Sequence, residues 1–484
     1  MEDNSIKKNV VLNILYTIIN ILFPIITFPY VSRIILVERM GAVSFFTSVA
    51  SYATMCGSLG ISMHGIRAVA KVRDDKKKLS GVSYELEIIN IFATLVVLAL
   101  LIIAVPFVSK FQSEPLLLLI NCFLVFSNAF GMNWFYSGLE QYAYITKRTI
   151  LIKILSLVLL LCFVKTIDDY VLYAAIIAFS TVASNCINFL HARKFINRPM
   201  LDHLEFKKHI KPMLLIFSSI LAVSVYTNLD TVMLGFISGN REVGLYTVAV
   251  KSKTLLLTMV NAISTVLLPR LSYYFSNRME KEYNRTVKKS ISIIFMISVP
   301  LTLFFILDAY DCIVILGGKE YLDATLCMQI IMPILLISGF SNITGNQVLI
   351  PHGQDSYFMR AVTAGAIVDL VLNIFMIPSF GSIGAAVATL LAEITQMSIQ
   401  FNYSKKCILP NIQWRTIAKI IASASIAGVI VYGAGNFISF NALIRIILLA
   451  TIYFGIYGLS LILMKEKLFL DILQELASKV IKRM

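Results

Sequence analysis

The segment IINIFATLVVLALLIIAVPFV (88–108) contains no charged residue over 21 consecutive positions. A helix rises about 1.5 Å per residue, so this segment is long enough to cross the hydrocarbon core of a bilayer, which is about 30 Å thick. Only helices and closed barrels satisfy all their backbone polar groups in lipid. The alternating polar and apolar pattern of a barrel strand is absent, so the segment predicts a transmembrane helix.

The composition extends this prediction to the whole chain. Of its 484 residues, 58% are hydrophobic and only 14% are charged, whereas a soluble domain of this size needs far more charged surface. The seven cysteines stand singly without a C-x-x-C motif, so neither a disulfide framework nor a zinc site is predicted. Lys7 and Lys8 precede a long apolar segment without a small-residue cleavage site, which we interpret as a retained first span.

Positive charge is distributed as expected for about fourteen spans. With the N-terminus in the cytoplasm, 33 of the 42 Lys and Arg residues fall on the cytoplasmic side, as the positive-inside rule requires. Both chain ends are then cytoplasmic. The net charge of +15 is explained by topology and by attraction to the anionic inner leaflet, so no nucleic-acid partner is predicted. The predicted spans are 9–36, 41–64, 85–109, 115–139, 149–165, 170–191, 212–238, 243–269, 288–310, 323–350, 357–377, 382–403, 414–437 and 441–464.

Two matched residue pairs indicate an internal repeat. Gly41 opens the second span and Arg67 closes it 26 residues later, and Gly244 and Arg270 bound the eighth span at the same spacing. Each half then has six spans, so the halves share one orientation, an arrangement used by alternating-access transporters. We predict an all-α membrane protein with two parallel six-helix bundles around a central cavity. The predicted domains are 1–203, 204–410, two additional helices at 411–464, and an amphipathic cytoplasmic tail at 465–484.

The segments between the spans are short. The longest predicted outer loop, near 308–323, is acidic and includes Asp308 and Asp311, and no such segment could fold as a separate catalytic domain. The motifs G-x-x-x-x-G-K-[ST], H-E-x-x-H and G-x-S-x-G are all absent. Neither catalysis nor a bound cofactor or metal is therefore predicted.

Ionisable residues within the apolar segments give the clearest functional signal. A charge at the bilayer centre costs about 2.5–3.5 kcal/mol on insertion scales, so such residues usually face a wet cavity or a partner. The candidates are Asp230, Lys251, Lys253 and Glu393, although Lys251 could instead reach the membrane interface by snorkelling.

Residues nearer the span ends leave two interpretations open. Asn133, Trp134 and Tyr136 could contact a sugar or anchor the chain at the interface. A topogenic role and a binding role both fit the basic residues at cytoplasmic ends, which are Arg67, Arg148, Lys153 and Arg270.

Across almost the entire chain, the sequence resembles bacterial polysaccharide (Wzx-type, O-antigen or capsule repeat-unit) flippases. These belong to the multidrug/oligosaccharidyl-lipid/polysaccharide exporter superfamily. One departure is Asp369, where an asparagine or an apolar residue is expected. The stretches that carry the resemblance are FPIITFPYVSRII (23–35), LGISMHGIRAVAKVRDD (59–75), NWFYSGLEQYAYITKRTILIKI (133–154), DDYVLYA (168–174), HIKPMLLIF (209–217), YTNLDTVMLG (226–235), VGLY (243–246), VLLPRLS (266–272) and FGSIGAAVATLLAE (380–393).

The resemblance implies transfer of an undecaprenyl-pyrophosphate-linked oligosaccharide from the inner to the outer leaflet of a bacterial cell membrane. The residues fit this substrate, because a pyrophosphate cannot cross hydrocarbon without replacement of its hydration by cations. Arg33, Lys251 and Lys253 are then anion contacts, with Arg67 and Arg270 at the entrance. The acidic candidates Asp230 and Glu393 either pair with these cations or couple transport to H⁺ or Na⁺. A polymerase and other assembly proteins are possible partners.

Three alternatives remain at this point. A cation-coupled multidrug exporter of the same superfamily would need an acidic, aromatic cavity, which Lys251 and Lys253 disfavour. A lipid II flippase is a second alternative, and these residues do not distinguish it well from a polysaccharide flippase. A polysaccharide polymerase or membrane glycosyltransferase is disfavoured by the short outer loops.

Overall fold

The computed structural model describes residues 26–197, 204–435 and 440–481, together with a few single positions outside these ranges. All the regular elements in these residues are helical. Most of the predicted first span lies outside them. The single positions are Leu12, Tyr16, Ile19, Asn20, Phe23, Pro24 and Phe437.

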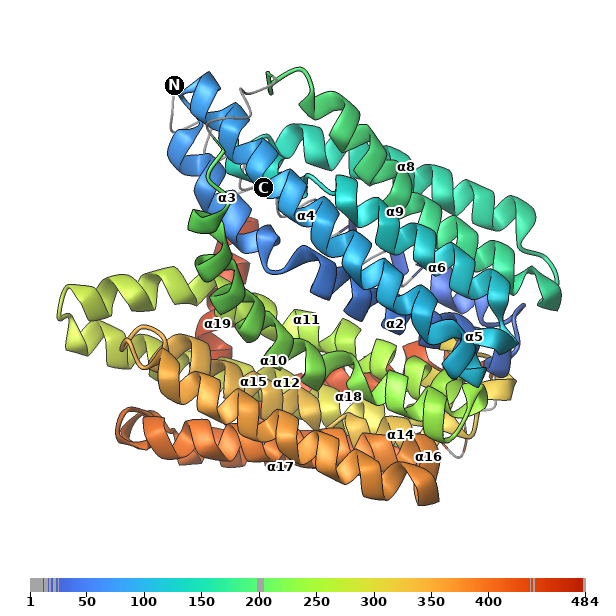
Figure 1. Ribbon diagram of the computed structural model, residues 1–484. Helices are drawn as coiled ribbons and strands as arrows, with labels where there is room; N and C mark the ends of the chain where they lie inside the picture. Colours follow the sequence, from blue (N-terminus) through green and yellow to red (C-terminus); the bar gives the residue numbers. More distant parts are fainter. Residues whose placement is uncertain are drawn as a thin grey trace. The chain divides into compact units, whose positions relative to one another are not determined.

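The chain divides into two compact units, Met1–Gly244 and Leu245–Met484 (Figure 1, blue to green and yellow-green to red). The predicted domain boundaries and the repeat stay predictions. The first unit contains α2 (Val37–Ser58), α3 (Ile61–Val72), α4 (Lys76–Ala104), α5 (Ser109–Ser113), α6 (Pro115–Ser127), α7 (Asn133–Gly138), α8 (Tyr142–Phe163), α9 (Tyr170–Ala192), α10 (Lys207–Ile237) and the start of α11 (Asn240–Ser276).

The second unit holds the rest of α11 and the remaining helices. Its helices after α11 are α12 (Glu280–Leu307), α13 (Ala309–Leu316), α14 (Ala324–Ile331), α15 (Ile334–Asn342), the π-helix η6 (Ile343–Leu349), α16 (Asp355–Ile408), α17 (Trp414–Gly435), α18 (Ala442–Leu463) and α19 (Lys467–Ile481).

Helices occupy every predicted span from the second to the fourteenth. Within the described residues, nine helical segments are long and apolar enough to cross a membrane, and one of them, Asp355–Asn411, covers two predicted spans. The predicted fold class, an all-α integral membrane protein, is confirmed. The central cavity stays a prediction.

The first unit departs from the prediction at the end of its second span. We expected that span to reach residue 64, but α2 ends at Ser58 and the chain bends before α3. Leu59 and Gly60 both have positive φ, 43° and 81°, a conformation that ends a right-handed helix. The bend gives α3 its own direction, and α10 packs against both α2 and α3.

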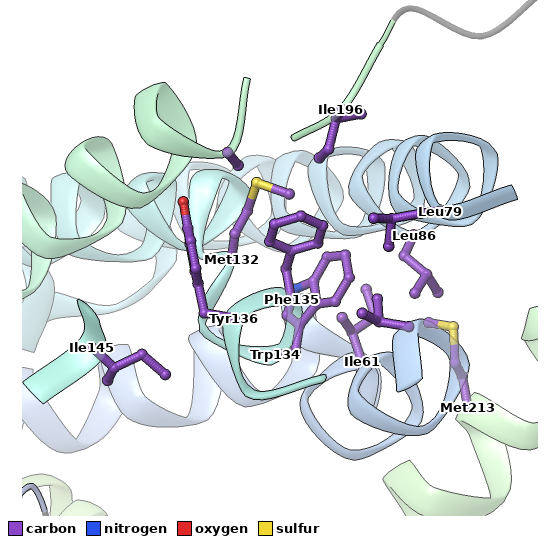
Figure 2. Packing of buried hydrophobic residues seen from close by; sticks show 12 residues of the cluster. Ile61, Leu79, Leu86, Met132, Trp134, Phe135, Tyr136, Ile145, Ile196 and Met213 are labelled. Carbon is purple, nitrogen blue, oxygen red and sulfur yellow. The ribbon is translucent and has the colours of Figure 1, made fainter. Parts of the chain in front are cut away.

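Trp134 and Tyr136 lie in a hydrophobic core, which corrects both interpretations of this aromatic segment. Figure 2 shows Trp134 and Phe135 packed in this cluster near Ile61 and Met132. The indole of Trp134 covers Gly65 of α3, where a larger residue would collide with the ring. These aromatic residues therefore hold α7 against α3 and face neither sugar nor the membrane interface.

The glycines that mark the predicted repeat approach each other within the first unit. A Cβ atom on Gly41 would collide with the backbone of Asn240 and Gly244. A Cβ atom on Gly244 would collide with the carbonyl of Val37. Both positions therefore require glycine because backbone meets backbone there.

In the second unit, α16 is a helical hairpin. The chain reverses at Gly381 (φ 53°, ψ −130°), and Gly384 then packs against the backbone of Met376. Gly384, Ala388 and Ala392 are all buried and four residues apart, so they form a small-residue face that permits close helix packing. The eleventh and twelfth predicted spans are thus joined almost without a loop.

The segment predicted as an acidic outer loop, near 308–323, lies between the apolar helical segments that end at Leu307 and begin at Ala324, and it is partly helical. Residues 309–316 form α13, and Asp308 and Asp311 are both buried. Arg445 of α18 pairs with Asp311, with 3.3 Å between its Nε and the carboxylate Oδ2. This partner, far along the chain, explains how a carboxylate at the predicted loop becomes buried.

Candidate functional site

The seven predicted site residues are distributed over both units. The first unit contains Arg33, Arg67 and Asp230, and the second contains Lys251, Lys253, Arg270 and Glu393. Their assembly into one site therefore stays a prediction, and each residue is described within its own unit.

The three arginines are exposed. Arg33 lies in the turn before α2, Arg67 lies on α3, and Arg270 lies in the part of α11 beyond its candidate span, which ends at Asn261. Exposure of Arg67 and Arg270 fits either a topogenic or a binding role on the predicted cytoplasmic side. Arg33 lies on the predicted outer side, so the positive-inside rule does not account for it.

The other four residues lie deeper. Lys251 and Lys253 are half-buried within the apolar part of α11. Asp230 of α10 is only 2% exposed and Glu393 of α16 only 5%. Buried or half-buried ionisable groups within apolar helices indicate function rather than folding alone.

Polar side chains are also buried on both arms of α16. Asp369 and Asn373, one helical turn apart, are fully buried. On the second arm of α16, the amide oxygen of Gln400 accepts hydrogen bonds from Ser341 of α15 (2.7 Å) and from Thr344 of the π-helix η6 (3.0 Å). We call these three side chains the Gln400 network. Because π-helical turns often occur at functional sites, the Gln400 network is a further candidate for contact with a polar ligand.

Arg148 has a structural role that neither sequence interpretation included. It is buried, and its guanidinium donates hydrogen bonds to the side chains of Asn188 and Asn133, the latter at 3.1 Å. The Tyr136 hydroxyl donates to the Asn188 carbonyl at 2.8 Å. Arg148 therefore joins α7, α8 and α9 from inside the first unit.

A relay of buried side chains joins α3, α4 and α10. Glu85 and His209 are almost fully buried, and Glu85 Oε2 lies 2.8 Å from His209 Nε2. His209 Nδ1 lies 2.8 Å from His64 Nε2. Since the carboxylate accepts, His209 donates from Nε2 when neutral and accepts from His64 at Nδ1. The three side chains thus form a continuous hydrogen-bonded chain.

Two further donors complete the coordination of the Glu85 carboxylate. The backbone N–H of Glu205 donates to Oε1 at 2.7 Å, and Lys208 Nζ lies 3.0 Å from Oε2. We call Glu85, His209, His64 and Lys208 the Glu85 cluster. Burial lowers the pKa of His64, and His209, Lys71 and Arg67 lower it further.

Ion pairs in the described residues agree with the predicted sidedness. Arg39 of α2 pairs with Glu114 at 3.0 Å, and both lie at predicted outer ends. Arg73 pairs with Glu140 at 2.8 Å, and both lie on the predicted inner side. The Glu85–Lys208 and Asp311–Arg445 pairs each join two segments that the predicted topology places on the same side of the membrane. In both cases an even number of predicted spans separates the two segments.

A family model described as "Polysaccharide biosynthesis protein" matches residues 6–275, more than half of the chain. The chain belongs to this family. The family resemblance that we drew from the residues is thereby confirmed, and the nine apolar helical segments make this member a multi-pass membrane protein.

Similar proteins include one named as a putative transporter and one named as a probable flippase. The chain is 25% identical to a putative O-antigen transporter of Escherichia coli (strain K12), over 84% of this chain and 98% of that protein. It is 22% identical to a probable low-salt glycan biosynthesis flippase of Haloferax volcanii, over 48% of each chain.

Solved structures show the same fold. The lipid II flippase MurJ in an inward closed conformation aligns with a TM-score of 0.75 at 16% identity, over 94% of this chain and 100% of that chain. An inward-facing multidrug resistance transporter of the MATE family aligns with a TM-score of 0.64 at 16% identity, over 83% of this chain and 98% of that chain. At these identities the likeness concerns the fold alone.

The sequence analysis missed the Glu85 cluster and the Gln400 network. Bonded members are separated by up to 145 residues in the cluster and 59 in the network, so no local pattern connects them. One available signal was the presence of Glu85, His209 and Gln400 in or beside apolar segments, where a polar side chain needs a partner.

Proposed function

We propose that this protein is a flippase that moves undecaprenyl-pyrophosphate-linked oligosaccharide repeat units from the inner to the outer leaflet. Membership of a polysaccharide biosynthesis family and relatives named O-antigen transporter and flippase support the substrate class. The observation that carries the proposal is the presence of Lys251, Lys253, Asp230 and Glu393 within apolar helices of such a protein.

In this proposal the basic residues replace the hydration of the pyrophosphate. Arg33, Lys251 and Lys253 contact the anionic headgroup, and Arg67 and Arg270 receive it at the inner side. A guanidinium offers paired donors to phosphate oxygens, whereas an ammonium acts as a point charge. The prenyl chain stays in lipid while the headgroup crosses by alternating access of the two halves.

The acidic residues have one of two roles in the proposal. Asp230 and Glu393 either neutralise the cations when no substrate is bound, or bind a coupling H⁺ or Na⁺. No organic cofactor is required for either role. The protein acts as a transporter rather than an enzyme, in a bacterial cell membrane with both chain ends in the cytoplasm, beside a polymerase that uses the exported units.

A flipping assay with the purified protein reconstituted into lipid vesicles tests this function. Vesicles carrying a pyrophosphate-linked prenyl oligosaccharide are exposed to an external glycosidase, which cleaves only units in the outer leaflet. We expect time-dependent cleavage of inner-leaflet units with the wild type, and a loss of about tenfold or more with Lys251→Ala, because one desolvated charge contact is removed. Lys406→Ala, an exposed residue at the end of α16, is the control.

Two outcomes would contradict the proposal. Wild-type vesicles that protect the inner-leaflet units as well as empty vesicles do would exclude flipping of this substrate. Uptake of a cationic dye under the same conditions would instead support a multidrug exporter. If Lys251→Ala flips at the wild-type rate, Lys251 is not an anion contact.

A further inference from the structure

A pocket of about 540 Å³ lies in the second unit among α12, α17 and α19. None of the seven predicted substrate-site residues lines it. Cations outnumber carboxylates in its lining, seven to three. Six of the cations are Arg285, Lys288, Lys289, Arg415, Lys419 and Lys467.

The one buried carboxylate of this pocket, that of Glu466, accepts hydrogen bonds from neutral groups of the protein. Thr416 donates to Glu466 Oε1 at 3.2 Å, and the backbone N–H of Phe469 donates to Glu466 Oε2 at 2.7 Å. Glu466 therefore caps the start of α19 and ties it to α17. It forms no ion pair in the described residues, so its charge is not directed at a lysine.

Most of the cations are free to bind an anion. In the described part of the second unit, none of Arg285, Lys288, Lys289, Arg415 and Lys467 forms an ion pair. Lys419 differs, since its Nζ donates to the carbonyl of Met464 at 2.7 Å and so satisfies the end of α18. Several like charges around one hollow repel one another, and an anion bound there would relieve that repulsion.

The surroundings of the pocket are apolar. Trp414, next to Arg415, is 66% exposed, and Leu463 at the end of α18 is 74% exposed. Leu468, Phe469 and Ile472 of α19 pack into the core formed by α12, α17 and α18. An exposed tryptophan beside basic residues is typical of the membrane–water interface, where lipid acyl chains and headgroups meet.

We propose that this pocket binds the phosphate-bearing headgroup of an anionic glycerophospholipid. The cations hold the phosphate, and the acyl chains lie along the exposed apolar residues at the ends of α17 and α18. A soluble phosphate offers the same charge, but Trp414 and Leu463 at nearby helix ends place the pocket beside the bilayer surface, where lipid headgroups are concentrated, so the lipid is the favoured source. Basic pockets between helices on the cytoplasmic side of a membrane commonly bind such headgroups.

Trp414 lies between the pocket residues Gln413 and Arg415 in the sequence and provides a fluorescent reporter for this region. The chain contains two tryptophans, and the other, Trp134, is buried in the core of the first unit. The full-length protein is placed in vesicles of phosphatidylcholine and phosphatidylglycerol, with bromine on the acyl chains of one lipid and then of the other. Bromine quenches a nearby indole, and the Trp414→Phe variant supplies the Trp134 background.

We expect phosphatidylglycerol to be enriched beside Trp414 over phosphatidylcholine. Lys288→Gln/Lys289→Gln should reduce that preference by about tenfold or more, because each cation near an anionic headgroup contributes substantially to binding. The matched control is Lys405→Gln/Lys406→Gln, a tandem pair of exposed lysines outside the pocket, which should keep the preference. Arg415→Gln provides a second pocket variant if the double variant does not fold.

Three results would overturn the proposal. Equal quenching by the two brominated lipids would mean that no headgroup is selected. An equal loss of preference in the control pair would mean general attraction of the surface to anionic lipid. In pure phosphatidylcholine vesicles, a shift of Trp414 emission on addition of inorganic phosphate or pyrophosphate, without a preference for phosphatidylglycerol, would assign the pocket to a soluble anion.

Discussion

The Glu85 cluster and the α12–α17–α19 pocket differ in whether their positively charged groups have partners within the protein. In the cluster, one buried carboxylate receives His209, Lys208 and a backbone N–H, so the donors are satisfied within the protein. In the pocket, none of the seven cations forms an ion pair among the described residues, and the one buried carboxylate is used as a helix cap.

This difference separates charge that holds the fold from charge that awaits a ligand. A buried ion pair is costly to break because the remaining group keeps its charge in a poorly solvated place. Exposed, unpaired cations add nothing to the fold and repel one another. The two regions should therefore respond to mutation with opposite signs.

Glu85→Ala should give the largest effect. It leaves the buried His209 and the backbone N–H of Glu205 without an acceptor, and breaking a buried pair costs about 3–5 kcal/mol. We expect the midpoint of thermal unfolding in neutral detergent to fall by roughly 6–12 °C. Glu85→Gln keeps an acceptor and should lose less. If both variants melt like the wild type, the cluster does not hold α10 to α3 and α4.

Acidification should weaken the same cluster. Because the pKa of His64 is lowered in the folded protein, first by burial and then by His209, Lys71 and Arg67, the unfolded chain binds more protons. Stability should therefore be complete above about pH 6.5, the ordinary histidine pKa, and should fall as the pH drops below it. His64→Gln should flatten the dependence of the melting midpoint on pH between 7 and 5. An unchanged slope would remove His64 from the cause.

Arg415→Gln should have a smaller effect whose sign depends on the lipid. In neutral detergent, removal of one of several repelling cations should stabilise the protein by about 0.5 kcal/mol. In phosphatidylglycerol vesicles the same change should destabilise it, because a headgroup contact is lost. Melting in both media measures the reversal, and the same sign in both would contradict the contrast between the two regions.

Arg73→Gln should have the smallest effect. Arg73 pairs with Glu140 at 2.8 Å, but both side chains are about half exposed, at 43% and 54%. Exposed pairs contribute about 0.2–1 kcal/mol, and salt screens them. A loss as large as that of Glu85→Ala would show that burial is not what distinguishes the two pairs.

The helices were predictable because their signal is local. Thirteen predicted spans coincide with helices, since each needs only about twenty consecutive apolar residues. The bend between α2 and α3 was missed because it needs two consecutive residues with positive φ, Leu59 and Gly60. Glycine commonly adopts this conformation, but leucine does not, so the sequence carries no signal at Leu59. The burial of Asp311 was missed because its partner, Arg445, lies on a helix more than a hundred residues later.

The site was predictable only as a set of candidates. Hydropathy identifies Asp230 and Glu393 as charges within apolar segments, and both are buried. It cannot identify partners, so the Glu85 cluster and the hydrogen bonds of Gln400 became visible only in three dimensions. Trp134 was predicted to contact a sugar or the membrane interface, but it lies in a hydrophobic core. The sequence alone cannot separate these positions, because an aromatic residue near a span end fits an interface and a core equally well.

The chain reversal at Gly381 affects where an epitope tag can be inserted and how the two arms of α16 enter the membrane during synthesis. A hydropathy plot would select residues 378–382 for an epitope tag, yet an insertion there would separate Gly384 from the backbone of Met376. We expect the two arms of α16 to leave the translocon together as one unit, because neither arm alone can cover the face of Gly384, Ala388 and Ala392.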